Sequence, residues 1–396
     1  MHSDTQKTHK APRDFLWLTL FLIIFVNGFE SGGYQASLWS IGQSYDLTIA
    51  SMGMFAAVEL LADMLAPILL GGWADHVGKT KSMLTMLVLQ LVATAAVWFS
   101  REGMWFLVAM FVLGLTTSAL QFIAIATCAD AYPRSGDKKI GYLTSMYALG
   151  AVVSPLVVAF YLDAGLDWRL LFLLLGLGSA LALAGVALSG TEPREEAPVA
   201  RTGEGAHGHF VLPAILLLCV IMAIYVGFEN GFAFFVDTLF TDVFHASTGK
   251  LALSLYWAVM IPARVLVGYF ARHARKILLG AVITIPCVAL MVAFAPSSEL
   301  VLALCVPLGL ASGAIYPCVL TTMIPFAGKR TATAAGMITA ATGIGGFSFT
   351  ALTGLVADQW GLQAALGVLA GFFVIALAAV LGVTALYRRL DLQPEA

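Results

Sequence analysis

The stretch Gly71–Lys81, GGWADHVGKTK, is a short polar turn between two long apolar runs. Residues 50–72 come before it and residues 82–100 follow it, and each run is long enough to cross a bilayer as a helix, which takes about 20 mostly apolar residues. Asp75 stands just past the end of the first run, and Lys79 can reach an acid on a neighbouring helix. This pattern predicts two membrane-spanning helices joined by a charged turn.

The rest of the chain has the same character. Of its 396 residues, 60% are hydrophobic and 11% are charged, whereas a soluble domain carries roughly 25% charged residues. We therefore expect an all-α, multi-pass membrane protein. A span-by-span reading gives twelve apolar segments: 15–38, 50–72, 82–100, 104–131, 140–163, 168–190, 210–236, 250–271, 277–295, 299–326, 332–357 and 363–387.

Lys and Arg are distributed unequally between the turns, which predicts the orientation of the chain. One set of turns and both ends are rich in bases, whereas the other set carries only Arg101, Arg169 and Lys250. We expect a cell inner membrane protein with both termini cytoplasmic. The expected parts are an N-terminal tail (1–14), a six-helix bundle (15–190), a cytoplasmic linker (191–209), a second bundle (210–387) and a C-terminal tail (388–396).

Several functions are disfavoured by what the sequence lacks. The five cysteines lie in apolar segments without metal-ligand spacing, and we find neither a phosphate-binding loop nor a nucleophile–base pattern. We expect no metal, no cofactor, no nucleic-acid partner and no enzymatic activity. An ion gradient is then a better candidate energy source than ATP.

The two halves of the chain repeat each other. The stretch Gly28–Gly32, GFESG, recurs as Gly227–Gly231, GFENG, and Gly71 has a counterpart in Gly268 at nearly the same separation. Two parallel six-helix repeats, related by an axis along the membrane normal, are one known transporter architecture.

The turn quoted first closely resembles the cytoplasmic signature of the major facilitator superfamily, G-x-L-A-D-R-x-G-R-K. It departs from the signature at Trp73, His76 and Thr80. The resemblance implies the major facilitator fold, with two six-helix bundles in a pseudo-twofold arrangement and alternating access. It also implies that a cytoplasmic latch controls gating, and it assigns the latch to five residues: Gly71, Asp75, Gly78, Lys79 and Asp130.

Shorter resemblances point to different branches of that family. Trp168, Arg169 and Phe172 are similar to an opening common in drug-efflux branches. Tyr225–Glu229, YVGFE, is similar to the fucose-symporter-like sugar branch. These hints conflict over the direction of transport.

Five charged residues lie well inside the predicted spans, away from their ends, and such residues are functional candidates by default. Glu30 and Glu229 are related by the repeat, and the resemblance implies that they lie on opposite walls of a central cavity. They either carry a proton or bind substrate there, or each is held by hydrogen bonds and only stabilises one state. Glu59 and Asp63 are one helical turn apart and repel each other unless one is protonated.

Alternatives remain open for the other candidates. Glu59 and Asp63 could bind a cation or a proton, or pair with Arg264, which could itself be structural or a counter-charge in the cavity. The aromatic residues either pack against other helices and lipid or offer a stacking surface for sugars or flat cations. Further cavity candidates are Asn27, Asn230, Tyr34, Gln121, Phe228, Trp257 and Tyr316.

The sequence thus predicts a monomeric, proton-coupled secondary transporter in the lipid bilayer, with Glu30 and Glu229 as the titrating pair. Four intramembrane acids against one base favour a small neutral or cationic substrate. Efflux of amphipathic cations and proton symport of a sugar-like solute are the alternatives. A receptor-like membrane protein that does not transport is the hypothesis the sequence favours least.

Overall fold

The computed structural model describes residues 15–131, 136–189, 210–328 and 331–390. These residues contain twelve helices long and apolar enough to cross a membrane, as expected of segments that are hydrophobic all round. The helices are α1 (Phe15–Ser44), α2 (Ile49–Val77), α3 (Lys79–Phe99), α4 (Gly103–Ala131), α5 (Gly136–Asp163), α6 (Leu170–Ser189), α7 (Leu212–Thr238), α8 (Gly249–Tyr269), α9 (Ala274–Ala293), α10 (Ser298–Ala327), α11 (Thr331–Trp360) and α12 (Leu362–Arg389).

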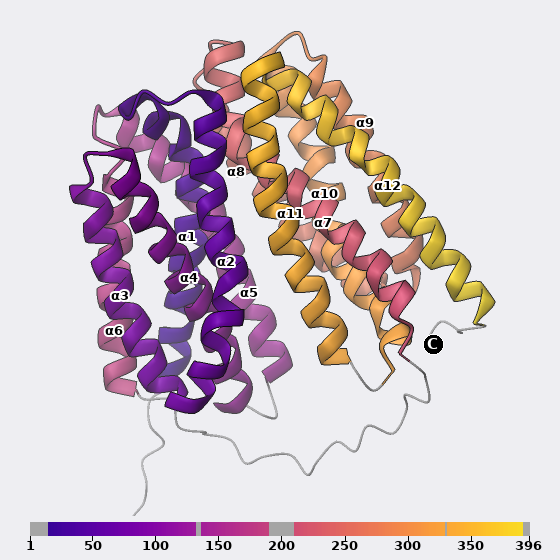
Figure 1. Ribbon diagram of the computed structural model, residues 1–396, viewed down its shortest axis with the longest axis horizontal. Coiled ribbons are helices and arrows are strands. Elements are labelled where there is room, and N and C mark those ends of the chain that lie inside the picture. Colours follow the sequence, from indigo (N-terminus) through magenta and orange to yellow (C-terminus); the bar gives the residue numbers. More distant parts are fainter. Residues whose placement is uncertain (1–14, 132–135, 190–209, 329–330, 391–396) are drawn as a thin grey trace, which may run out of the picture.

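The helices form two bundles that lie side by side (Figure 1). α1 packs against α5 and α6 in the first bundle, and α7 packs against α11 and α12 in the second. The bundles meet mainly through two helix pairs, α2 with α11 and α5 with α8, and α1 also contacts α7 and α8. This arrangement confirms the expected fold of two six-helix bundles.

The sequence repeat between the two halves also appears in the packing of the helices and in the turns. A Cβ atom at Gly28 would collide with the backbone of Tyr147 on α5, and one at Gly227 would collide with Phe349 on α11. Both glycines therefore allow the closest helix contact in their bundle. The turns after α1 and after the π-helical turn η1 (Leu239–Val243) also correspond, since Asp46 and His245 have φ angles of 50° and 52°.

Several helices differ from their predicted bounds. α2 continues to Val77 and α3 begins at Lys79, so the predicted turn is mostly helical and breaks only at Gly78. α1 continues to Ser44, six residues past the expected end, because its second half is still helix-forming and ends in polar side chains. α12 continues through Arg389, so Arg388 and Arg389 are helical rather than part of a tail. The expected N-terminal tail and linker lie outside the described residues, and the division into bundles at 15–190 and 210–387 stays a proposal.

We name the two ends of the molecule by the connection between the bundles. The linker end is where α6 ends and α7 begins, at the bottom of Figure 1, and the opposite end is at the top. At the opposite end, Trp39 Nε1 donates to Asp242 Oδ1 at 2.7 Å, and the Ala50 amide donates to Asp358 Oδ1 at 3.4 Å. The backbones of Gly53 and Gly354 touch there.

The linker end is packed differently. A Cβ atom at Gly71, Gly72, Gly268 or Gly336 would meet no atom within 4 Å. These glycines sit near the linker ends of α2, α8 and α11. The bundles are therefore joined tightly at the opposite end, while helices at the linker end leave space around their glycines.

Candidate functional site

A cavity of about 250 Å³ lies between the two bundles. Residues of both halves line it: Ser31, Gln35, Leu60, Asp63 and Tyr147 from the first, and Tyr225, Val226, Glu229, Asn230, Trp257, Arg264, Tyr316, Thr342, Gly343 and Gly346 from the second. Its position matches that of a site reached alternately from either side of the membrane.

Three acids gather on the wall formed by the first bundle, and we call Glu30, Glu59 and Asp63 the three-acid cluster. Glu30 is fully buried and Glu59 is 3% exposed, whereas Asp63 reaches the cavity. The carboxyl groups of Glu30 and Glu59 lie side by side, and Asp63 is close enough for its charge to act on both. Glu30 projects from α1, and the other two share one face of α2.

The buried carboxyl groups of Glu30 and Glu59 are poorly supplied with hydrogen-bond donors. Within the described residues, neither carboxyl oxygen of Glu30 has a donor, and Oε2 of Glu59 has none either. An ionised carboxylate can only accept hydrogen bonds, and a buried charge without a partner costs several kcal/mol or more. Two adjacent buried carboxyl groups satisfy each other when one of them holds a proton. The arrangement is therefore chemically suited to binding a proton.

The wall formed by the second bundle is different. Glu229 lies beside the Tyr225 side chain, and the charge of Arg264 on α8 acts on it. Tyr256 lies within electrostatic reach of both Glu229 and Arg264. In the described part of the chain, the hydroxyls of Tyr225 and Tyr256 and Nε of Arg264 have no hydrogen-bond partner. Buried donors without partners are suited to the polar groups of a bound solute or to water.

The two repeat-related acids thus have unequal surroundings. Both acids lie within electrostatic reach of phenols. They differ in charge, because Glu30 faces two further acids whereas Glu229 faces a base. The sequence left open whether Glu59 and Asp63 pair with Arg264 or bind a proton. In the structure it is Glu30 that lies against them, and Arg264 acts on Glu229.

Six of the residues expected at the site line the cavity: Asp63, Glu229, Asn230, Trp257, Arg264 and Tyr316. Two others serve the packing of the first bundle, where Asn27 Nδ2 donates to the Thr117 carbonyl at 2.9 Å and the Tyr34 hydroxyl donates to the Phe55 carbonyl at 2.8 Å. Phe228 is buried between Phe232 and Phe373. Gln121 belongs to α4, which contributes no residue to this lining.

Sequence reasoning missed several lining residues. Gln35 accepts a hydrogen bond from Trp257 Nε1 at 3.0 Å, which joins the two bundles across the cavity. Ser31, Tyr147 and Tyr225 line the cavity as well. Gln35 lies one turn past Ser31 on α1, so extending the helical face of the quoted GFESG stretch by one turn would have found it.

The charged turn between α2 and α3 has partly the expected geometry. Gly78 has a φ of 94°, a conformation that favours glycine, and Lys79 Nζ donates to the Ala126 carbonyl near the end of α4 at 3.2 Å. Lys79 thus reaches the helix that carries Asp130. The side chains of Asp75 and Asp130 lie outside the described residues, and the latch stays a prediction.

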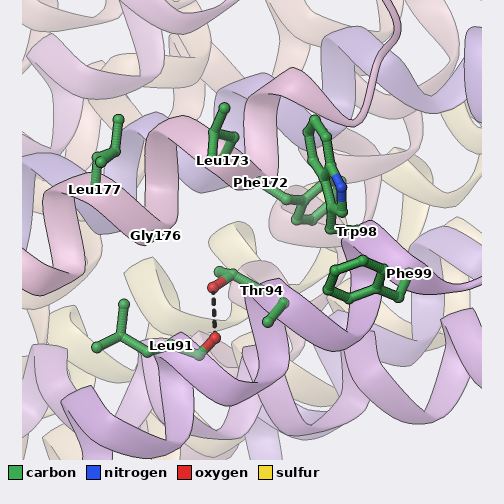
Figure 2. A pocket seen from close by; sticks show the side chains of 9 residues that line it. Leu91, Thr94, Trp98, Phe99, Phe172, Leu173, Gly176 and Leu177 are labelled. Atoms are coloured by element: carbon green, nitrogen blue, oxygen red, sulfur yellow. Dashed lines mark hydrogen bonds between the residues drawn. The ribbon is translucent and has the colours of Figure 1, made fainter.

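A larger hollow lies on the outer face of the first bundle, between α3 and α6 (Figure 2). Its volume is about 360 Å³, and its lining is almost wholly apolar, including Trp98, Phe99 and Leu177. Thr94, its one hydroxyl group, is already bonded to the Leu91 carbonyl at 2.9 Å. A hollow of this kind on a membrane-facing surface fits lipid chains rather than a polar solute.

Comparison with known proteins agrees with this architecture. The family model of the Major Facilitator Superfamily matches residues 20–350. The chain belongs to the major facilitator superfamily. It is therefore a multi-pass membrane protein of a family of transporters.

Individual relatives of this superfamily member are distant. The niacin transporter NiaP of Acinetobacter baylyi is 27% identical over 149 residues, which is 37% of this chain and 34% of that protein. Protein TsgA of Salmonella typhi is 26% identical over 140 residues, 35% of each chain. The matched region thus spans about a third of either relative.

The fold extends over nearly the whole chain. A bacterial homologue of the human lysosomal transporter Spinster, solved in an inward-facing and occupied conformation, superposes with a TM-score of 0.81. The alignment covers 95% of this chain and 98% of that one at 16% identity. At this identity the likeness establishes the fold.

Proposed function

We propose that this protein is a proton-coupled secondary transporter that moves a small neutral or cationic solute by alternating access. The observation that carries the proposal is the three-acid cluster beside a cavity shared by both bundles. A carboxyl group at this depth is neutral when it holds a proton and costly when it does not. Opening the cavity to water on one side would then change its proton occupancy.

The cluster and the opposite wall have separate roles in this proposal. Glu30 and Glu59 share the proton, and Asp63 connects them to the cavity. Glu229, Arg264 and the phenol of Tyr225, which all line the cavity, bind the solute's polar groups. Glu229 would then be the substrate-facing member of the pair of acids, and Glu30 the proton-binding member.

The cavity constrains the solute. Ligand pockets for drug-sized molecules typically measure about 300–1,000 Å³, and this one is smaller, about 250 Å³. Two acids and one base line it, Asp63 and Glu229 against Arg264, which favours a neutral or cationic solute over an anion. The small volume argues against efflux of bulky amphipathic cations. The side chains of Gln35, Asn230 and Thr342 keep sugar-type symport as the second candidate.

Charge distribution supports an orientation. The linker end of the second bundle carries Arg272, Arg275, Lys276, Arg388 and Arg389, and bases accumulate on the cytoplasmic side. We therefore propose an inner-membrane protein, a monomer, whose termini and linker are cytoplasmic. With its opposite end closed by Trp39–Asp242 and Gly53–Gly354, this conformation would face the cytoplasm.

The test begins with a thermal-shift screen of the purified protein at one acidic and one alkaline pH. Nicotinic acid, which the name of one relative suggests, nicotinamide, a nucleoside, a hexose and a quaternary ammonium ion would serve as probes. A probe that stabilises the protein at only one pH reports both the solute class and its linkage to protons.

Uptake of the probe that stabilises the protein most is then measured in proteoliposomes under an imposed pH gradient. Glu30→Gln should abolish accumulation driven by the gradient but keep exchange of internal for external solute. Glu229→Gln should weaken binding of the probe itself, and Glu102→Gln, an exposed acid at a helix start, is the matched control. If Glu30→Gln transports normally under the pH gradient, proton coupling at the cluster is refuted. If the wild type transports none of the probes that stabilise it, the receptor-like alternative is favoured.

A further inference from the structure

A further pocket lies at the linker end of the second bundle, and it shares no lining residue with the central cavity. It measures about 490 Å³ and lies between the start of α9 and the end of α12. Four bases line it together with one imidazole, one hydroxyl and one phenol: Arg272, Arg275, Lys276, Arg388, His273, Thr384 and Tyr387. No acid is among the lining residues, all of which the structure describes.

The pocket has one preformed element. The guanidinium of Arg275 lies over the ring of Tyr387, 3.4 Å from its centroid, and Tyr387 is buried against Phe326. Stacking of this kind holds a guanidinium plane in place and leaves its N–H groups free to bind an anion. Arg275 is therefore positioned more firmly than a charge on a free surface side chain.

General accumulation of bases on one side of the membrane does not account for this pocket. The two bundles are repeats, so such a bias alone would enrich the equivalent junction of α3 and α6. α3 begins with Lys79 and Lys81, but α6 has no base in its last turn, whereas α12 ends in Arg388 and Arg389. Bases on both helices of the junction are therefore a property of the second bundle.

The surroundings indicate what kind of anion fits. About two turns deeper along the two helices, Ile283 of α9 and Leu381 of α12 are exposed on the surface that the bilayer covers. A rise of 1.5 Å per residue places these residues about 10 Å below Lys276 and Arg388 along the helix axes. An anion held by the bases would thus have an apolar surface directly beneath it, as a phospholipid requires.

We propose that this pocket binds the phosphate headgroup of an anionic phospholipid from the leaflet at the linker end. Basic pockets between membrane helices on the cytoplasmic side are suited to such headgroups. Arg272, Arg275, Lys276 and Arg388 bind the phosphate, and the acyl chains lie along α9 and α12. The site concerns the lipid environment and does not depend on the function proposed for the cavity.

The test uses the full-length protein in detergent and counts bound lipids by native mass spectrometry. The probes are phosphatidylglycerol and phosphatidylcholine with identical acyl chains, and inorganic phosphate is added in a separate thermal-shift titration. We expect phosphatidylglycerol to bind at least tenfold more tightly than phosphatidylcholine. The double variant Arg272→Gln/Arg388→Gln should weaken phosphatidylglycerol binding roughly 30-fold, given the usual contribution of two interfacial bases.

Two further variants make the result specific. Lys81→Gln/Arg101→Gln removes two exposed bases from the first bundle and should leave lipid binding unchanged. Arg275→Lys keeps the charge but loses the planar stack, and it should weaken binding several-fold. Equal losses in the pocket variant and the control variant, or full binding by Arg275→Lys, would show diffuse attraction and overturn the proposal. Stabilisation by inorganic phosphate as strong as that by the lipid would also overturn it, in favour of a soluble phosphate site.

Discussion

At the residue scale, Glu30 and Glu229 have the same local sequence but different partners. Glu30 lies against Glu59, and no base of the described residues acts on the three acids, whereas Glu229 lies within the field of Arg264. A base stabilises an ionised carboxylate, and a second acid next to it favours the protonated form. The repeat therefore supplies two equivalent positions, and residues on α2 and α8 make them chemically distinct.

This difference predicts a protonated carboxyl in the first bundle. In infrared difference spectra recorded between acidic and alkaline pH, the wild type should show the carbonyl band of a protonated carboxylic acid. Glu30→Gln should remove much of that band, yet the fold should hold, because the amide supplies the missing donor to Glu59.

The infrared spectra of two further variants test this prediction. Glu59→Gln should have the same effect as Glu30→Gln, since the proton belongs to the pair. Glu102→Gln, at an exposed site, should leave the band intact. A full band in both single variants of the pair would show that the cluster does not hold the proton.

At the scale of the helices, four glycines fix how the cavity walls are built. Gly28 and Gly150 bring α1 against α5, and Gly227 and Gly345 bring α7 against α11. Each would place a Cβ atom into the backbone or ring of the facing helix. Glu30 stands on α1 and Glu229 on α7, so this packing sets where these two acids point.

Substitution of these glycines should therefore be costly. We expect Gly28→Ala or Gly345→Ala to lower the free energy of unfolding by about 3 kcal/mol or more, because backbone must move rather than side chain. The measurement is the thermal unfolding midpoint of the purified protein. Gly280→Ala and Gly371→Ala are matched controls in open space on α9 and α12 and should be neutral or mildly stabilising. Equal shifts in both pairs would contradict the packing described.

Much of this element-level structure follows from the sequence, and some does not. Segment length and hydropathy predict the twelve spans, and the repeated GFESG and GFENG stretches predict the two bundles. Both patterns can be read directly from the sequence without knowing which helices pack together. The rotation of each helix about its axis depends on the helices packed against it. The contact between Glu30 and Glu59 therefore could not be predicted from the spacing of apolar residues along the chain. The same is true of Tyr147 and Gln35, which reach the cavity only once α1 and α5 have packed.

At the scale of the whole molecule, the two bundles are held together at the opposite end by few polar contacts. Trp39 and Asp242 form the shortest of them described here, at 2.7 Å, and Ser254 Oγ donates to the Val152 carbonyl at 2.8 Å. The Trp39–Asp242 bond is exposed to water, so we expect a net contribution of about 0.5–1.5 kcal/mol, which still matters beside the few kcal/mol that separate conformations of such a protein.

We accordingly expect Trp39→Phe to shift the population toward molecules open at the opposite end. Spin labels at Gln43 and Ser247, which are exposed on the two bundles there, would report this as a larger share of long distances in electron–electron resonance. Trp105→Phe alters an exposed tryptophan on α4 and should give the wild-type distribution. An unchanged distribution in Trp39→Phe would mean that Trp39 and Asp242 do not control closure.

The depth of the three-acid cluster has a consequence for energy supply. Glu30 lies near the middle of α1, so a proton that reaches it from either side crosses part of the electric field across the membrane. A proton that enters from one side and leaves on the other, with an uncharged solute, moves one net charge. The membrane voltage then contributes about 2.3 kcal/mol per 100 mV to accumulation. Such a protein would respond to voltage even where the pH is equal on both sides, and its turnover would register as an electrical current.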